Sequence, residues 1–356
     1  MEKIPVLQVV PHSCRGGVES VAAELMRVDK RKYISHYVYF LDDNEIHLRK
    51  SYVKGFFSLF RYAIKNNVKL IHNHSPLLKW LFFTRLVSIL LRVPLVITIH
   101  SDFGLNDEIS LFKRGKSFAI VRLLNRLHRR LVADFWIAVS EPVSLFLVDK
   151  VNVDSKMVCV INNFIHKTEI DVSGQIEKRK YVVYVGRDSK EKNVSDLVMA
   201  WKQINGRFED VSLLLIGVSR DSECLLGVDL EESRIIATGW LAEMEINQLM
   251  TNALLQVIPS SYEGFPLAFL QAVEKNIPVV TYNIPIFSHL SSVIDGLFVA
   301  NGNNYVSLSE MMSVVIRKVK DGYVLKEKTK VNNMFSSEKF LSEHENTYRF
   351  IIKSPN

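Results

Sequence analysis

Residues 259–280 read PSSYEGFPLAFLQAVEKNIPVV, and this stretch decides the fold. The apolar run 254–258 before it is long enough for a buried strand. Pro266 fits the first turn of a helix, where a missing N–H is tolerated. The residues that give this helix an apolar side are Leu267, Leu270, Ala272 and Val273. With a further strand from Pro278, the stretch predicts strand, loop, helix and strand, the repeating order of a parallel α/β sheet.

Glu263 lies just before the start of this predicted helix. Free backbone N–H groups and the positive end of the helix dipole gather there. Open α/β sheets bind anionic or polyhydroxyl ligands outside the carboxyl ends of their strands. Two interpretations follow: Glu263 contacts a ligand, or it only stabilises the helix terminus.

The stretch resembles the donor-site signature of the retaining glycosyltransferases of family 4, which have the GT-B fold. That signature is Pro-Ser, then Glu-Gly-Phe-Gly/Pro, then a helix with a second Glu eight positions after the first. Pro259 and Ser260 match, and so do Glu263, Gly264, Phe265 and Pro266. Position 271 departs, because it is Gln. The resemblance gives the second Glu hydrogen bonds from the ribose, and Gln271 can accept these but carries no charge; Glu274, one turn on, is a candidate to compensate.

Composition describes a folded chain of two domains. The 356 residues are 48% hydrophobic and 23% charged. Three cysteines with no bridging or zinc spacing favour a reducing compartment, and no apolar signal core follows Met1. The apolar stretch 80–99 contains Arg85, Arg92 and Pro94, so a buried helix followed by a strand is expected there rather than a membrane span.

Charge is unevenly distributed along the chain. Residues 1–165 hold 24 Lys and Arg and 14 Asp and Glu, whereas the remainder holds 21 and 24. Residues 111–132 are basic and amphipathic. They suit either a solvated helix face or a peripheral contact with an anionic leaflet. Nucleic acid is electrostatically allowed but no binding motif accompanies the charge, so no nucleic-acid partner is expected.

The first half predicts six strands, at 6–10, 37–41, 68–71, 95–99, 135–139 and 158–161. A turn with Gly16 and Gly17 follows the first and resembles the family's Gly-Gly-x-Glu turn, which lines the cleft. His72 and His74 alternate at the end of the third; they could form half of a metal site, but no acidic or cysteine partner lies nearby in sequence. The resemblance places such a pair on the lining of the interdomain cleft. His100 follows the fourth and matches the family's donor-contacting His.

The second half opens with a strand at 181–185 that ends in Gly186 and Arg187, with Lys192 five residues on. Such cations can clamp a diphosphate, although surface charge on a loop is the plainer interpretation. The resemblance assigns Arg187 and Lys192 to the donor's diphosphate, with Lys190 as an alternative. It also places the strand-end turns at Gly217 and Gly239 around the base and ribose.

The fold expected is therefore α/β, GT-B: two doubly wound Rossmann-like domains facing across a cleft. The expected layout is an acceptor-binding domain at 1–165, a linker at 166–180, a nucleotide-sugar-binding domain at 181–335, and a C-terminal helix at 336–356 that packs back on the first domain. In the hinge, Phe164 stands where the family has glycine, with Asn163 and Ile165 matching.

The resemblance implies a retaining, metal-independent hexosyltransferase with no cofactor. It would move a hexose or related sugar from a nucleotide-sugar, with UDP favoured, to a glycan or polyprenyl-linked acceptor of capsule, O-antigen, lipopolysaccharide or exopolysaccharide synthesis. The expected location is cytoplasmic, with peripheral contact at the inner membrane face. The catalytic set would be His100, Glu263, Arg187 and Lys192. The alternatives are a non-catalytic GT-B protein that binds a glycan or partner, and a GT-B sugar-nucleotide epimerase or hydrolase.

Overall fold

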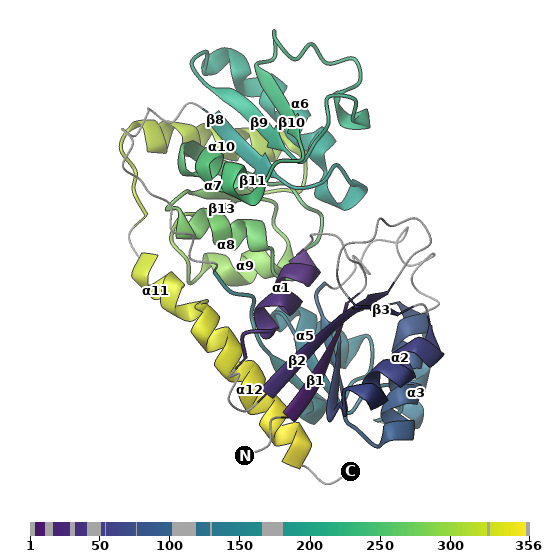
Figure 1. Cartoon of the computed structure of the whole chain (residues 1–356). Helices are drawn as coiled ribbons and strands as arrows, with labels where there is room; N and C mark the ends of the chain where they lie inside the picture. Colours follow the sequence, from purple (N-terminus) through teal and green to yellow (C-terminus); the bar gives the residue numbers. More distant parts are fainter. Residues whose placement is uncertain are drawn as a thin grey trace. The chain divides into compact units, whose positions relative to one another are not determined.

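Figure 1 shows the computed structural model of the chain. It describes residues 4–10, 17–28, 33–40, 51–53, 55–75, 77–101, 119–128, 130–165, 181–325 and 328–353. Gly16, residues 111–118 and the predicted linker 166–180 lie outside these ranges. The chain divides into two compact units: unit 1 is Met1–Phe164 with Phe335–Asn356, and unit 2 is Ile165–Met334.

Unit 1 is built on a parallel sheet with the order β3-β2-β1-β4-β5-β6-β7. The strands are β1 Ile4–Val10, β2 Tyr33–Phe40, β3 Ser51–Val53, β4 Leu70–Asn73, β5 Leu95–Ile99, β6 Phe135–Ala138 and β7 Val158–Val160. The short edge strand β3 was not predicted, because three residues carry no apolar run. β2 begins four residues before the predicted strand, since YISH at 33–36 mixes polar and apolar residues.

The helices of unit 1 are α1 Gly17–Leu25, α2 Phe56–Lys65, α3 Leu78–Leu91 and α5 Glu141–Asp149, with residues 119–127 also helical. α3 ends at Arg92, whose left-handed backbone (φ 53°) turns the chain into β5. The apolar stretch 80–99 is thus a helix and a strand, as its arginines and proline predicted. Across the described residues, no helix has both the length and the hydropathy needed to cross a bilayer.

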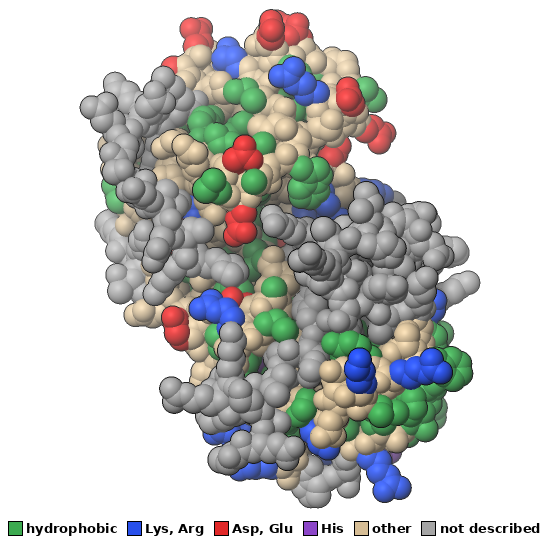
Figure 2. Space-filling model, viewed as in Figure 1, with side chains coloured by type: hydrophobic (Ala, Val, Ile, Leu, Met, Phe, Trp, Pro, Cys, Tyr) green, Lys and Arg blue, Asp and Glu red, His purple; other side chains and the backbone are tan. Residues whose placement is uncertain are grey.

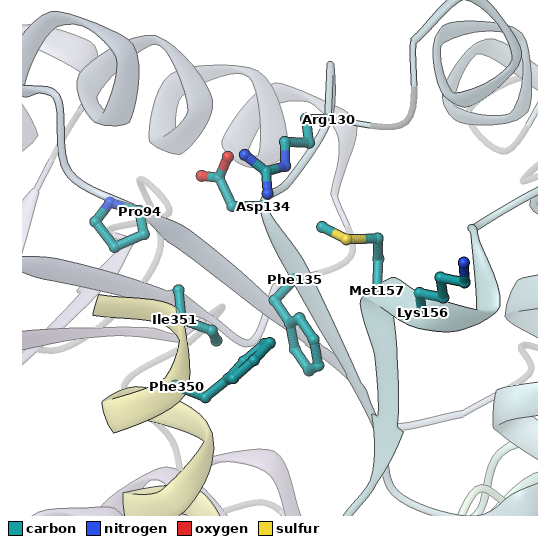
Figure 3. A pocket seen from close by; sticks show the side chains of 8 residues that line it. All are labelled: Pro94, Arg130, Asp134, Phe135, Lys156, Met157, Phe350 and Ile351. Carbon is teal, nitrogen blue, oxygen red and sulfur yellow. The ribbon is translucent and has the colours of Figure 1, made fainter. Parts of the chain in front are cut away.

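The C-terminal helix α12, Ser337–Lys353, returns to unit 1 (Figure 1). The Phe340 ring lies 4.6 Å from that of Phe164, centroid to centroid. Near the end of α12, Phe350 and Ile351 line a pocket of about 70 Å³ with Phe135 and Met157 (Figure 3). The predicted return of the C-terminal helix is confirmed.

Unit 2 contains a second parallel sheet, in the order β10-β9-β8-β11-β12-β13. Its strands are β8 Tyr181–Val185, β9 Ser212–Ile216, β10 Ile235–Gly239, β11 Ala253–Ile258, β12 Val279–Thr281 and β13 Leu297–Val299. Its helices are α6 Val194–Ile204, α7 Glu243–Thr251, α8 Leu267–Glu274, α9 Pro285–Ser291, α10 Tyr305–Lys320 and α11 Lys328–Met334. β11 is buried throughout, as a strand covered on both faces requires.

Both sheets reverse their strand order beside the first strand of the unit. The reversal falls between β1 and β4 in unit 1 and between β8 and β11 in unit 2. Loops diverge at such a point, which leaves a crevice at the carboxyl ends of the strands where α/β proteins bind ligands. The residues predicted from the sequence follow these strands: Gly17 follows β1, Arg187 follows β8 and Glu263 follows β11.

Candidate active site

The turn after β11 leads into α8 without a side-chain cap. Pro266 is the residue before the helix (φ −73°, ψ 124°), so it lies one position earlier than predicted. Within the described residues, the start of α8 has no side-chain capping hydrogen bond. The interpretation that Glu263 stabilises this helix terminus therefore has no capping hydrogen bond to support it and rests on the helix dipole alone.

One carboxylate oxygen of Glu263 instead accepts hydrogen bonds from two side chains. Lys192 Nζ lies 2.5 Å from Glu263 Oε1, and Ser260 Oγ donates to the same atom at 2.8 Å. The Glu263 side chain is 12% exposed and that of Lys192 is 25% exposed, while Ser260 is fully buried. Among the described residues Oε2 has no partner, so it can accept a hydrogen bond from a hydroxyl group.

Backbone contacts join the loops after β8 and β11. Asn193, which has a left-handed backbone (φ 47°), donates from Nδ2 to the carbonyl of Pro259 at 3.1 Å. The N–H of Ser261 donates to the carbonyl of Glu191 at 2.9 Å. Lys192 is therefore carried to Glu263 by a fixed loop, although 71 positions separate them in the chain.

The two cations of the loop after β8 lie in different surroundings. The Arg187 side chain is 67% exposed and reaches Glu191 only at 3.7 Å. Burial alone would raise the pKa of Glu191, but backbone and Ser189 hydrogen bonds, together with Lys192 and Arg187, hold it below its ordinary value. Lys190 is exposed, so Lys192 and not Lys190 is the lysine that meets Glu263.

Three glycine turns meet at the ends of β8, β9 and β10. Gly186 N–H donates to Ile216 O at 3.0 Å, and Gly217 N–H donates to Gly239 O at 2.8 Å. Gly217 has φ +90°, and a Cβ there would lie 2.4 Å from the Gly186 carbonyl oxygen. Only glycine permits this approach. The turns predicted to surround the nucleotide are thus joined to one another by backbone hydrogen bonds, next to Arg187.

Gln271 lies in α8 and is partly buried. Glu274, considered as a compensating carboxylate, is paired with Lys275 at 2.6 Å. The two side chains are 16% and 4% exposed, so this pair is shielded from water. Because Glu274 already has a cation, it is a poor substitute for the missing second Glu.

In unit 1 the histidines form a buried cluster. His72 and His74 are 0% and 1% exposed, so their side chains do not line a surface as the resemblance implied. His74 Nδ1 lies 3.1 Å from Nε2 of His100, which is partly exposed. Burial, with a smaller effect of His344, lowers the pKa of His100 to about 3. His100 is therefore neutral at pH 7.

The cluster also includes residues that sequence reasoning did not select. Gln8 on β1 and His344 and Tyr348 on α12 are all buried. The available signals were a polar residue inside the apolar run 6–10, and a His and a Tyr four positions apart on a helix. Within the described residues, no group of three or more His, Cys, Asp or Glu could hold a metal ion.

Two family models match consecutive parts of the chain. Residues 15–169 match Glycosyltransferase Family 4, and residues 166–332 match Glycosyl transferases group 1. The chain belongs to the group 1, family 4 glycosyltransferases. This confirms the resemblance seen in residues 259–271.

Curated relatives of this family are distant. The chain is 24% identical over 222 residues to alpha-D-kanosaminyltransferase of Streptomyces kanamyceticus, covering 57% of this chain and 56% of that one. It is 28% identical over 156 residues to the O-antigen chain mannosyltransferase RfbU of Salmonella typhimurium, covering 42% of each. It is 23% identical over 286 residues to lipopolysaccharide 1,6-galactosyltransferase of Escherichia coli, covering 75% and 76%. The first two matches thus span only about half of each relative.

Solved structures share the whole architecture. Anabaena HepE in complex with UDP-glucose has a TM-score of 0.76 and 17% identity, covering 97% of this chain and 99% of that chain. Sucrose-phosphate synthase of Thermosynechococcus elongatus has a TM-score of 0.72 and 18% identity, covering 98% and 99%. At this identity the likeness establishes the GT-B fold and nothing further.

Proposed function

We propose that this protein is a retaining glycosyltransferase that moves a hexose or related sugar from a nucleotide-sugar, with UDP favoured, to a glycan or lipid-linked acceptor. The observation that carries the proposal is the Lys192–Glu263–Ser260 group at the carboxyl ends of β8 and β11 in unit 2. Two relatives are named for O-antigen and lipopolysaccharide synthesis, and one structural neighbour was solved with UDP-glucose.

The chemistry of transfer separates a sugar from a nucleoside diphosphate. The leaving diphosphate gains negative charge, and preorganised cations stabilise that charge best where water is excluded. Arg187 is free to reach a diphosphate because most of its side chain is exposed. Lys192 supplies the second cation, and Glu263 Oε2 accepts from a sugar hydroxyl. The proposal also assigns His100 to the donor sugar, as the resemblance implies. Metal independence is part of the proposal, since these side chains supply the charge.

The test is a transfer assay on the full chain. UDP-glucose, UDP-galactose and GDP-mannose are each offered with a synthetic polyprenyl-diphosphate-linked saccharide, with and without EDTA, and the product's anomeric configuration is read by NMR. The proposal predicts transfer from one donor, with retention and without loss in EDTA. Glu263→Gln is expected to abolish it. If the protein binds a donor but neither transfers nor releases its sugar, the non-catalytic alternative is favoured. If the nucleotide-sugar is recovered in epimerised form, the epimerase is favoured.

A peripheral membrane contact is also proposed, on a face made by α2, α3 and residues 119–127, here called the basic apolar face. Residues 46–101 contain no Asp or Glu, and neither do residues 119–127. Exposed apolar side chains of this face are Phe57, Ile64, Phe82, Ile89, Leu123 and Leu127. Figure 2 shows hydrophobic side chains with Lys and Arg among them over α2 and α3. Of the stretch 111–132 predicted for this contact, residues 111–118 and 129 lie outside the described residues.

This face also contains an apolar groove of about 480 Å³ between α3 and the 119–127 helix, lined by Leu81, Phe82, Val121 and Leu124 among others. Basic residues near an anionic leaflet each contribute about 1 kcal/mol, and apolar side chains insert beside them. Vesicle flotation tests the contact: binding is expected to vesicles with phosphatidylglycerol and to be lost in Phe82→Ser. Leu226→Ser, equally apolar and 72% exposed in unit 2, is the matched control. Equal flotation of all three proteins would contradict the contact.

A further inference from the structure

A buried chain of hydrogen bonds ends on His100. It runs from Tyr348 on α12 to Gln8 on β1, then to His74 after β4, and then to His100 after β5. The distances are 3.0 Å between Gln8 Nε2 and Tyr348 Oη, 3.0 Å between His74 Nε2 and Gln8 Oε1, and 3.1 Å between His74 Nδ1 and His100 Nε2. Tyr348, Gln8 and His74 are at most 1% exposed. Water therefore does not compete for these partners.

The amide of Gln8 gives this chain a direction. Its Nε2 donates to Tyr348, so its Oε1 is the atom that faces His74. A carbonyl oxygen only accepts, and His74 Nε2 must therefore carry a proton. Burial, with smaller effects of His72, His100 and His344, holds the pKa of His74 well below its ordinary value, so His74 is neutral and its Nδ1 has a lone pair.

The protonation of His74 determines which ring nitrogen of His100 carries a proton. Because His74 Nδ1 can only accept, the proton between the two rings belongs to His100 Nε2. A neutral His100 then has no proton on Nδ1. The described residues provide no partner for this atom, and His100 is partly exposed. His100 thus presents a hydrogen-bond acceptor and not a donor.

We infer that Gln8 and His74 are positioning residues that fix the tautomer of His100, so that its Nδ1 accepts a hydrogen bond from a hydroxyl group of the donor sugar. The inference rests on the proposed function only in assigning the sugar to His100. An acceptor at Nδ1 restricts the donor sugar to one that carries a free hydroxyl or amino group at the contacted position. A deoxy or O-methyl sugar leaves Nδ1 without a donor.

A second branch of the same cluster provides a matched control. His72 contacts Tyr348 Oη at 2.7 Å and Thr98 Oγ1 at 2.6 Å, and His72 and Thr98 are 0% and 3% exposed. Thr98 is thus nearly as buried as Gln8 and belongs to the same network, but it does not lie between Gln8 and His100. Removing its hydroxyl perturbs the packing of the cluster and leaves the chain to His100 intact.

The experiment is long-range ¹H–¹⁵N NMR of the histidine rings in the full-length protein at pH 7, which distinguishes protonated from unprotonated ring nitrogens. The ring signals of His100 are assigned as those that are missing from the spectrum of His100→Asn. In the wild type we expect a protonated Nε2 and an unprotonated Nδ1. Gln8→Met should give a mixture of the two tautomers, and Thr98→Val should match the wild type. His74→Leu is the second variant that breaks the chain, for use if Gln8→Met does not fold.

Two results would overturn the inference: a proton on Nδ1 of His100 in the wild type, or a wild-type tautomer in folded Gln8→Met. These spectra need no ligand, so they decide the tautomer even if the proposed function fails. Titration then tests the sugar contact: UDP-glucose should move the Nδ1 signal, and UDP alone should not. If UDP-glucose binds and leaves Nδ1 unmoved, the assignment of the sugar to His100 is wrong.

Discussion

Replacing Lys192 and Arg187 separately by Met should change the stability of unit 2 by different amounts but weaken nucleotide binding by similar amounts. Lys192 contacts Glu263 at 2.5 Å with both side chains at least three-quarters buried. Hydrogen bonds to charged groups contribute about 1.5–3 kcal/mol. After a discount for the partial exposure of both groups, Lys192→Met should cost about 1–2 kcal/mol. Arg187 is 67% exposed and 3.7 Å from its carboxylate, so Arg187→Met should cost less than about 0.5 kcal/mol.

For UDP, however, the two variants should behave alike. Each removes one charge-assisted contact to the diphosphate, which weakens binding roughly ten- to a hundredfold. For a unit of the size of unit 2, 1 kcal/mol shifts Tm by about 2–4 °C. Calorimetric unfolding without nucleotide and titration with UDP measure the two effects. An unchanged Tm of unit 2 in Lys192→Met, or wild-type affinity for UDP in Arg187→Met, would contradict these roles of the two cations.

Three further predictions concern the turns, the histidines and α8. Gly217→Ala combines φ +90° with a 2.4 Å approach to Gly186 O and should destabilise unit 2 by about 2–4 kcal/mol, whereas Gly239→Ala (φ +66°, open space) should cost about 1 kcal/mol; equal losses in calorimetry would contradict the clash. Burial lowers the pKa of His344 to about 4, so between about pH 6.5 and 4 the unfolded state binds more protons than the folded state. This residue's contribution to the stability of unit 1 is therefore full above about pH 6.5. It falls by about 1.4 kcal/mol per pH unit as the pH drops through that range. His344→Leu should make the acid slope of unit 1 shallower, and a slope equal to that of the wild type would argue against this. Gln271→Glu restores a charged acceptor and should tighten UDP binding roughly fivefold, and an unchanged Kd would count against a ribose role.

Most of the fold could be predicted because it depends on local patterns. Apolar runs bounded by Gly, Pro and Asn marked the buried strands, and Arg85 with Arg92 correctly argued against a membrane span. The small errors have local causes. β3 is too short to show a pattern, and Pro266 is compatible with either the cap or the first turn of α8.

The partners within the site could not be predicted, because they depend on long-range contacts. Lys190 and Lys192 are equivalent in the sequence, and only the loop fixed by Asn193 and Ser261 brings Lys192 to Glu263. The cluster around His100 joins β1, β4, β5 and α12, with 340 positions between Gln8 and Tyr348. A single sequence contains no sign of such a pairing. The roles of the site residues in transfer stay predictions.

The most direct test of the nucleotide-sugar site is calorimetric titration of UDP, GDP, ADP and CMP into the wild type and into Arg187→Ala. One nucleotide, with UDP favoured, should bind the wild type, and Arg187→Ala should weaken its binding at least tenfold. A wild-type protein that binds none of the four, or binds one with no loss in Arg187→Ala, would contradict the assignment of a nucleotide-sugar site to the carboxyl ends of β8 and β11.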